Sequence, residues 1–276
     1  MSRAIKVSTT DRFNPIIILS DLVDGAKRVH LWLAFASDEI QNRYRRSKLG
    51  LAWIVISYLV FVASISLFFG NFSDLAHQNF TVYVAINFAI FTFLLANITE
   101  GCAVFRVART WISSVPLPHS IYIYKSIARS LFVFAINMIV ALGIFFLYGH
   151  KLALVALEAI PAFLVLLVNS VLIQMILGYI SARFRDIEHL VQSITRILFF
   201  TTPVLWVRQE HATPGLRNTI SEMNPLTHAL EIFSAPILGR HADPHSWYYI
   251  LCMTPILFVV ALIVGGFAHR RLPYWL

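Results

Sequence analysis

The side chains in this sequence that could bind a ligand are aromatic rather than catalytic. Several aromatic residues fall inside long uncharged segments: Trp53, Tyr58, Phe61, Phe88, Phe91, Phe93, Phe199 and Phe200. A flat apolar ring offers a sugar ring broad contact with few strong hydrogen bonds, which suits sliding more than trapping. Most rings in such segments pack only against lipid or other helices. Those that meet on one shared surface are the candidates for lining a passage.

A basic group, Arg43, Arg45 and Arg46, stands directly before the first long uncharged segment. Arginine makes charge-assisted hydrogen bonds to phosphate, so these residues can bind the phosphates of anionic lipids at the membrane surface. The same charges also hold that end of the segment in the cytoplasm by the positive-inside rule. The two roles are compatible.

The segment 105–118 has the composition of a contact element for a soluble partner. It contains Arg106, Arg109 and Trp111, and two prolines limit its end. A short amphipathic element of this kind can bind in a groove of another protein. An ordinary loop at the membrane surface would have the same composition, so both interpretations stay open.

A second charged segment is the turn that contains Arg183, Arg185 and Asp186. Arg183 and Asp186 are three residues apart and can pair on a helix, which favours a solvated cap on two helix ends. The alternative is that this turn, like the segment 105–118, contacts a soluble partner.

Motifs for catalysis, metal binding and nucleotide binding are missing from the sequence. It contains no G-x-S-x-G, no H-E-x-x-H and no Cys/His cluster with metal spacing. Its 10 histidines are scattered, and each is better explained as a loop or interfacial residue than as a ligand. Without a G-x-x-x-x-G-K-S/T loop the chain cannot hold ATP, so ATP and Mg²⁺ would bind a separate ATPase. We expect no enzyme activity, cofactor or metal in this chain.

Composition places these residues in a membrane. Of 276 residues, 58% are hydrophobic and 13% are charged, and the mean hydropathy is +0.71. A soluble domain has about a quarter charged residues. The net charge of +8 lies mostly in short segments beside apolar runs, where topology and anionic lipid explain it better than nucleic acid does. Cys102 and Cys252 fall near opposite membrane faces, so no disulfide is expected.

The apolar segments predict an all-α membrane protein with a single domain over 1–276. Most are close to the roughly 20 residues that a helix needs to cross a bilayer. Six spans are predicted, at about 51–69, 81–98, 126–148, 152–180, 190–206 and 250–268. Lys and Arg are concentrated in the connections that this order places inside. Both termini are therefore expected in the cytoplasm.

Two further elements flank the spans. Residues 20–40 carry an apolar stripe behind Ser20 as N-cap, which predicts one amphipathic helix in the membrane interface. Residues 207–249 include an apolar run too short to cross, which is typical of a re-entrant or interfacial segment. Within the spans, Arg129 is expected to snorkel to inner headgroups. Arg196 is expected either to snorkel or to face a cavity or partner.

Three segments, taken in order, resemble one known family. Residues 42–53, NRYRRSKLGLAW, are similar to the R-Y-x-x-S-x-L-G-x-x-W motif of the ABC-2 type permeases that export polysaccharide. Residues 183–187 with 199–204 resemble that family's R-D-I turn and F-x-x-x-P-V/I segment, and 224–228 resembles its N-P-L/M segment. The matches extend over nearly the whole chain. The likeness is greatest to O-antigen, capsule and teichoic acid exporters.

The resemblance implies a half-transporter. Two copies would form a continuous channel across a bacterial inner membrane for a lipid-linked, pyrophosphate-anchored polysaccharide, and would bind two copies of a separate ATPase. Arg43, Arg45 and Arg46 at the inner mouth of that channel would attract the pyrophosphate headgroup. It also implies that 20–40 is an interface helix, that 105–118 holds the helix that couples to the ATPase, and that 207–249 holds outer gate helices. The implied gate residues are Pro203, Trp206, Asn224 and Pro225.

Two other functions fit parts of the sequence. An ABC-2 permease for a small hydrophobic drug or lipid would have a narrow, interrupted channel in place of a continuous aromatic path. A membrane glycosyltransferase or scaffold would need paired acids at the membrane surface for sugar and metal chemistry. Asp74 and Glu158 stand alone in the sequence, which argues against the second of these.

Overall fold

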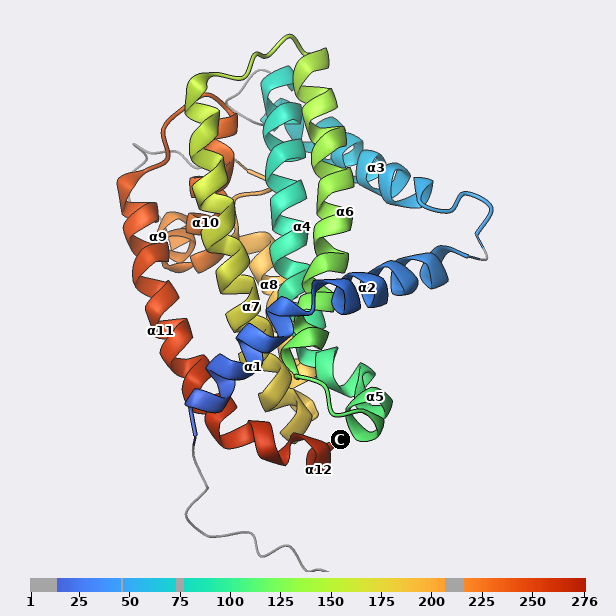
Figure 1. The fold of residues 1–276 in the computed structure, drawn as a ribbon. Helices are drawn as coiled ribbons and strands as arrows, with labels where there is room; N and C mark the ends of the chain where they lie inside the picture. Colours follow the sequence, from blue (N-terminus) through green and yellow to red (C-terminus); the bar gives the residue numbers. More distant parts are fainter. Residues whose placement is uncertain (1–13, 46, 73–76, 207–215) are drawn as a thin grey trace, which may run out of the picture.

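The computed structural model describes residues 14–45, 47–72, 77–206 and 216–276, and every regular element in these ranges is helical (Figure 1). Five of the described helical segments are long and apolar enough to cross a membrane. They contain α3 (Ala52–Phe69), α4 (His77–Val107), α6 (Ser120–Leu147), α7 (Ala159–Arg183) and α11 (Pro244–Ala268). The chain is thus an all-α protein with several membrane-spanning helices, as predicted.

Helix α4 is the centre of the bundle and packs mainly against α6 and α7 (Figure 1). It is apolar on nearly all sides, and a helix of that kind is buried rather than placed at a surface. Glycine permits the close approach of α4 to α7. A Cβ on Gly178 would lie 2.7 Å from Val104 Cγ1 and 2.9 Å from Phe105 Cε2.

The single interface helix predicted for 20–40 is two helices, α1 (Ile16–Lys27) and α2 (Val29–Tyr44). The backbone at Arg28 leaves the helical region, with φ −90° and ψ 46°, and turns the chain between them. Ser20 is not an N-cap, since α1 already begins at Ile16. Helix α1 presses closely on the start of α6, where a Cβ on Gly25 would lie 2.0 Å from Ser120 Oγ.

The fifth predicted span, 190–206, is replaced by α8 (Asp186–Thr201), which begins earlier and ends earlier. Asp186 and Glu188 in its first turn favour that start, because acidic side chains stabilise a helix N-terminus. The end agrees with Pro203, since the residue before a proline is disfavoured in a helix, and Thr202 is extended. At 16 residues, α8 is shorter than the five segments above.

The remaining predicted bounds differ mostly because the helices continue beyond their apolar cores. The span at 81–98 is part of α4, and those at 126–148, 152–180 and 250–268 belong to α6, α7 and α11. A short 3-10 helix, η2 (Leu154–Glu158), precedes α7. The segment 105–118 divides between the end of α4 and the short helix α5 (Arg109–Ser114).

Two short helices occupy most of the described part of 207–249, namely α9 (Leu216–Met223) and α10 (Pro225–Ile237). Residues 207–215 lie outside the described ranges. The chain closes with η3 (His269–Arg271) and α12 (Leu272–Trp275), and η1 (Gly70–Phe72) follows α3. We call the end of the bundle that carries α5 and α12 the α5 end, and the end with the α6–α7 connection the opposite end (Figure 1).

Candidate functional site

Most of the predicted channel aromatics meet in one group, here called the aromatic cluster: Tyr58, Phe61, Phe88, Phe91, Phe199 and Phe200. Phe61 of α3 stacks on Phe88 of α4 with ring centroids 3.7 Å apart, and Tyr58 stacks on Phe88 at 5.8 Å. Phe199 of α8 meets Phe61 at 6.0 Å and Phe91 at 5.7 Å. The cluster therefore joins α3, α4 and α8.

The rings of the aromatic cluster range from buried to exposed. Tyr58 and Phe91 are buried, whereas Phe200, whose ring lies 5.3 Å from that of Phe199, is 70% exposed. Trp53 lies apart, since it stacks on none of these rings in the described structure and is itself 49% exposed. Phe93 points elsewhere and packs in the core against Phe134, with ring centroids 5.2 Å apart.

Helix α8 also carries exposed polar residues along one side. His189, Gln192, Ser193 and Arg196 follow helical spacing and lead to Phe200, and all five side chains are exposed. We call these five residues the α8 stripe. Within the described part of the chain Arg196 makes no ion pair. A polar stripe on a helix in an otherwise apolar bundle is expected to face water or a partner rather than lipid.

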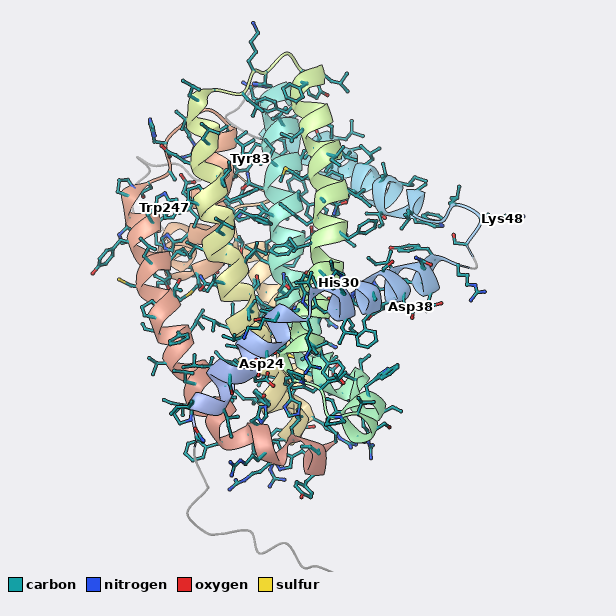
Figure 2. The ribbon with its side chains drawn as sticks, in the orientation of Figure 1. Asp24, His30, Asp38, Lys48, Tyr83 and Trp247 are labelled. Carbon is teal, nitrogen blue, oxygen red and sulfur yellow. The ribbon has the colours of Figure 1, made fainter. Side chains whose placement is uncertain are left out.

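The basic group at the predicted inner mouth lies on the turn between α2 and α3. Arg43 is in the last turn of α2 and Arg45 is its C-cap, and both are exposed. Lys48 lies at the tip of this turn, away from the bundle (Figure 2). Arg46 lies outside the described residues. The two described arginines are therefore accessible to solvent, and the charge of Arg43 also acts on Glu100 of α4.

Four charged residues beside the aromatic cluster's helices form an ion-pair network that the sequence did not indicate. Glu39 of α2 accepts contacts from Arg129 and, at 2.8 Å, from Lys125 of α6. Arg129 also pairs with Glu100 of α4 at 2.5 Å. The prediction that Arg129 snorkels to headgroups is wrong, because two carboxylates hold its guanidinium within the protein. The network fixes α2 to the bundle.

The α5 end presents the residues predicted to couple to a partner. Arg106, at the end of α4, pairs with Glu188 of α8 at 2.5 Å and joins these two helices. Arg109 and Trp111 of α5 are exposed, and the Trp111 ring lies 5.3 Å from that of Phe35 on α2. An exposed short helix held at both ends is a suitable shape for a groove.

The predicted pair between Arg183 and Asp186 does not form. Helix α7 ends at Arg183 and Phe184 is extended, so the two residues do not share a helix. The Arg183 guanidinium instead lies 5.7 Å from the ring centroids of both Phe184 and Trp275, as in a cation–π contact. Arg185 and Asp186 remain exposed at the α5 end.

The predicted gate residues are tied together at the start of α10. Asn224 accepts the backbone N–H of Leu226 at 3.0 Å as an N-cap, with Pro225 in the first turn. Its amide donates to Thr202 Oγ1 at 2.8 Å, which joins α10 to the end of α8. Tyr83 of α4 donates its hydroxyl to the carbonyls of Pro203 at 2.6 Å and Trp206 at 3.3 Å.

A separate polar cluster at the α5 end joins residues that are far apart in the sequence. Asp21 of α1 accepts the backbone N–H groups of His119 and Ser120, each at 2.8 Å, and so caps the start of α6. His269 Nε2 lies 3.2 Å from Asp21 Oδ1, and the rings of His119 and His269 are 4.3 Å apart. We call Asp21, His119 and His269 the histidine cluster.

Burial sets the charges of the histidine cluster. Loss of solvent lowers the pKa of His119 to about 4, so this imidazole is neutral at neutral pH. Burial alone would raise the pKa of Asp21, but the hydrogen bond and charge of His269 and the amide of Ser120 lower it overall. Asp21 is therefore a carboxylate at neutral pH.

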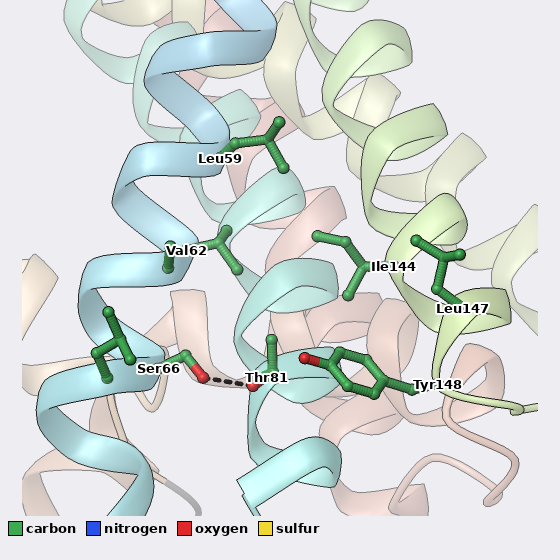
Figure 3. Close-up of a pocket in the computed structure, with 9 residues that line it drawn as sticks. Leu59, Val62, Ser66, Thr81, Ile144, Leu147 and Tyr148 are labelled. Carbon is green, nitrogen blue, oxygen red and sulfur yellow. Dashed lines mark hydrogen bonds between the residues drawn. The ribbon is translucent and has the colours of Figure 1, made fainter.

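An apolar groove of about 500 Å³ lies between α3, α4 and α6 toward the opposite end (Figure 3). Its lining is mostly aliphatic, with Tyr148 at one side and a hydrogen bond between Ser66 and Thr81 that joins α3 to α4. Few polar groups are available there to bind sugar hydroxyls. The aromatic cluster is the better candidate for contact with a sugar.

Comparison with known families decides the class of this bundle. A family model described as ABC-2 type transporter matches residues 30–238, which is most of the chain. The chain belongs to the ABC-2 type transporter family. The resemblance seen in its three sequence segments is thereby confirmed. The matched range of this ABC-2 protein includes the aromatic cluster, the α5 helix and all of α10.

Two curated relatives of this ABC-2 protein carry the same name. The O-antigen export system permease protein RfbA of Myxococcus xanthus is 21% identical over 216 residues, covering 78% of this chain and 83% of the relative. The protein of that name from Klebsiella pneumoniae is 21% identical over 252 residues, which cover 88% of this chain and 92% of the relative. The likeness thus extends over nearly the full length of each.

Most of the predicted aromatic residues of this ABC-2 protein meet in one cluster, but sequence reasoning missed two groups of charged and polar residues. The ion-pair network combines residues from three helices, and the histidine cluster combines Asp21 of α1 with His119 before α6 and His269 of η3, so no local motif indicates either group. One signal was present: Lys125 and Arg129 are four residues apart on one apolar helix, a placement that requires nearby acids.

Proposed function

We propose that this ABC-2 protein is the channel-forming subunit of an ATP-driven exporter of a lipid-linked, O-antigen-like polysaccharide. Two copies would enclose the passage across a bacterial inner membrane. The observation that carries the proposal is the continuity between the aromatic cluster and the α8 stripe. The names of the two relatives support the choice of a polysaccharide as the substrate.

The passage is proposed to run along α8. Phe199 belongs to the aromatic cluster, and Phe200 belongs to both the cluster and the α8 stripe. The rings would give a sugar chain apolar faces to slide over. Exposed Gln192 and Arg196 beside them would provide a hydrated polar surface for the sugar hydroxyls. The limited burial of α3 leaves it free to contact a second copy on the other side of the passage.

We further propose that α8 is a sixth, shorter crossing and that the α5 end is cytoplasmic. The exposed arginines of the α5 end, among them Arg109, Arg185 and Arg271, support this orientation by the positive-inside rule. Both termini would then lie in the cytoplasm. The turn carrying Arg43 and Arg45 would lie at the inner headgroups, where a pyrophosphate-linked substrate enters.

A separate ATPase is proposed to bind two copies of this chain at the α5 end. Exposed α5 would bind in a groove of the ATPase. Trp111 of α5 contacts Phe35 of α2, so a movement of α5 would also shift α2. Arg106 and Glu188 would carry that movement to α8. The ATPase supplies work only if its two nucleotide states bind α5 differently. ATP and Mg²⁺ would be held by the ATPase alone.

The opposite end is proposed to hold the gate. Helix α10 is buried on nearly all sides although it is too short to cross a bilayer, which suits a re-entrant helix. Asn224 ties its start to the end of α8, so a shift of α8 would reach α10 directly. Pro203 and Trp206, held by Tyr83, complete the connection.

The competing function is export of a small hydrophobic drug or lipid by the same fold. The groove between α3, α4 and α6 is the feature that favours it, since its aliphatic lining suits an acyl chain. The two functions differ in which surface must be intact. Polysaccharide export depends on the aromatic cluster, whereas export of a small lipid depends on the groove.

The test is complementation of a strain that lacks the gene. Phe88→Ala and Phe199→Ala each remove a ring from the aromatic cluster, and we expect them to lower surface polysaccharide at least about tenfold. Phe258→Ala on α11 is the matched control, because this exposed ring touches none of the cluster and export should persist. Leu59→Ala and Ile144→Ala, in the groove, should also export normally.

Membrane levels of each variant are measured in the same cells. Normal export by the Phe88→Ala and Phe199→Ala double variant, at a wild-type membrane level, would reject a passage along the aromatic cluster. Normal surface polysaccharide in the strain that lacks the gene would favour the competing function.

A further inference from the structure

We propose that the histidine cluster, Asp21, His119 and His269, is a binding site for a first-row divalent metal ion, with Zn²⁺ as the best match. Each residue offers one ligand atom, and these three atoms lie within 4.8 Å of one another. His269 Nε2 and Asp21 Oδ1 are 3.2 Å apart. Adjacent ligands of a tetrahedral Zn²⁺ are about 3.3 Å apart, given bonds of about 2.0–2.2 Å.

The donor set determines which ion fits. Two imidazoles and one carboxylate match the ligands of Zn²⁺ sites that keep one coordination position open. Ca²⁺ and Mg²⁺ prefer oxygen ligands, of which this cluster offers only those of Asp21.

The surroundings hold these ligands in place. The backbone N–H groups of His119 and Ser120 fix the two carboxylate oxygens of Asp21, each at 2.8 Å. Oδ2 keeps a further lone pair, and the second lone pair of Oδ1 faces His269 Nε2, whose hydrogen bond a metal ion would replace. Tyr179 Oη lies 3.5 Å from His119 Nδ1, where it can orient the ring. Such outer contacts are typical of metal sites and strengthen them.

The other histidines in the middle and at the opposite end lack this arrangement. His228 uses both ring nitrogens in the protein, with Ser246 Oγ at 2.9 Å and the Glu222 carbonyl at 2.8 Å. His241 pairs with Glu158 at 2.7 Å on an exposed surface. In the described structure the histidine cluster is the group of His, Cys, Asp and Glu residues with metal-like spacing.

The location suggests what the metal would do. Residues 115–118 connect α5 to His119, so the site lies where the α5 segment rejoins the bundle. Asp21 belongs to α1 and His269 follows α11. A bound ion would therefore clamp α1, the start of α6 and the end of α11 together. Such a clamp would fix the base against which α5 moves.

Metal binding to the purified full-length chain tests this inference without reference to export. The protein is prepared through a tag that contains no histidine, treated with a chelator, and loaded with ZnCl₂ before dialysis. We expect stoichiometric zinc in the wild type and in the His241→Gln control. His269→Gln and Asp21→Asn are each expected to bind Zn²⁺ about tenfold or more weakly.

Cobalt gives a second measurement that needs no variant. CoCl₂ added to the chelator-treated wild type should produce the intense visible bands of low-coordinate Co²⁺, and ZnCl₂ should abolish them. Wild-type protein with no stoichiometric zinc, or a His269→Gln variant that binds as tightly as the wild type, would overturn the proposal. A weak, six-coordinate cobalt spectrum would overturn it as well. These results leave the proposed export function unaffected, because none of them measures transport.

Discussion

Arg129 lies on a helix that crosses the membrane, and two carboxylates rather than lipid headgroups balance its charge. Glu39 and Glu100 come from α2 and α4, and Lys125 adds a second positive charge at 2.8 Å from Glu39. Removing one member of such a network leaves the others as poorly solvated charges. The network therefore explains how ion pairs fix α2 to the bundle.

Arg129→Met should destabilise the protein. Breaking a fully buried pair costs about 3–5 kcal/mol, and this partly exposed network is expected to lose about 2 kcal/mol, which corresponds to a drop in Tm of roughly 5 °C for a chain of this size. Thermal unfolding in detergent, followed by loss of the monodisperse peak, measures it. Arg196→Met is the matched control, because exposed Arg196 has no ion pair in the described structure. Equal Tm values for the two variants would show that the network is not stabilising.

Arg185 and Asp186 are exposed beside the α5 helix, without a described ion pair between them. Arg185→Ala and Asp186→Ala should therefore insert normally and yet impair export, because they alter the surface offered to the ATPase. Membrane level and surface polysaccharide are measured together. Normal export in both variants would make the turn a simple cap on two helix ends.

Among the elements, α10 is capped and linked to the end of α8 by one side chain, that of Asn224. Asn224 caps the helix with its oxygen and binds Thr202 of the α8 end with its nitrogen. One residue thus serves both the local structure of α10 and its connection to α8. The two roles can be separated by changing only one of the two atoms.

Asn224→Asp keeps the capping oxygen and removes the donor to Thr202, whereas Asn224→Ala removes both. The alanine variant should lose about 1 kcal/mol or more of stability from the cap, and the aspartate variant should keep that part. If the link to Thr202 operates the gate, both variants should impair export to a similar degree. Thermal unfolding and surface polysaccharide report the two effects separately, and full export by Asn224→Asp would remove the link from the mechanism.

At the scale of the whole molecule, function depends on surfaces that one chain leaves exposed. Helices α3 and α11 are mostly unburied along their lengths, and α8 exposes a polar stripe. In a bilayer the apolar surfaces can face lipid, but the α8 stripe requires water or a partner. This supports two copies around a wet passage rather than one chain acting alone.

Binding of the ATPase gives the prediction for the assembled transporter. Arg109→Glu reverses a charge on exposed α5 and should lower recovery of a co-expressed ATPase at least about tenfold, as expected for an interface contact. Lys151→Glu makes the same reversal at the opposite end and should leave recovery unchanged. Co-purification through a tag on this chain measures both. An equal loss in the two variants would place the ATPase contact elsewhere than α5.

The sequence by itself determined the class of this protein. Its apolar segments and three family motifs were sufficient for an all-α ABC-2 protein, because span length and local motifs are properties of neighbouring residues. The bounds of α3 followed almost directly from its uncharged run. The sequence left two possibilities open for the aromatic rings, namely packing against lipid or other helices and meeting on one shared surface. Helical periodicity does not show which helix faces meet, so it could not decide between them.

Only the tertiary structure decided which distant residues act together. The break at Arg28, the pairing of Arg129 with two acids, and the meeting of Asp21 with His269 all depend on how helices cross. Hydrogen bonds and ion pairs act over a few ångströms, and residues 248 positions apart reach that range only when the bundle has formed. The packing of the helices therefore created the histidine cluster and the ion-pair network from residues that looked unremarkable in the sequence.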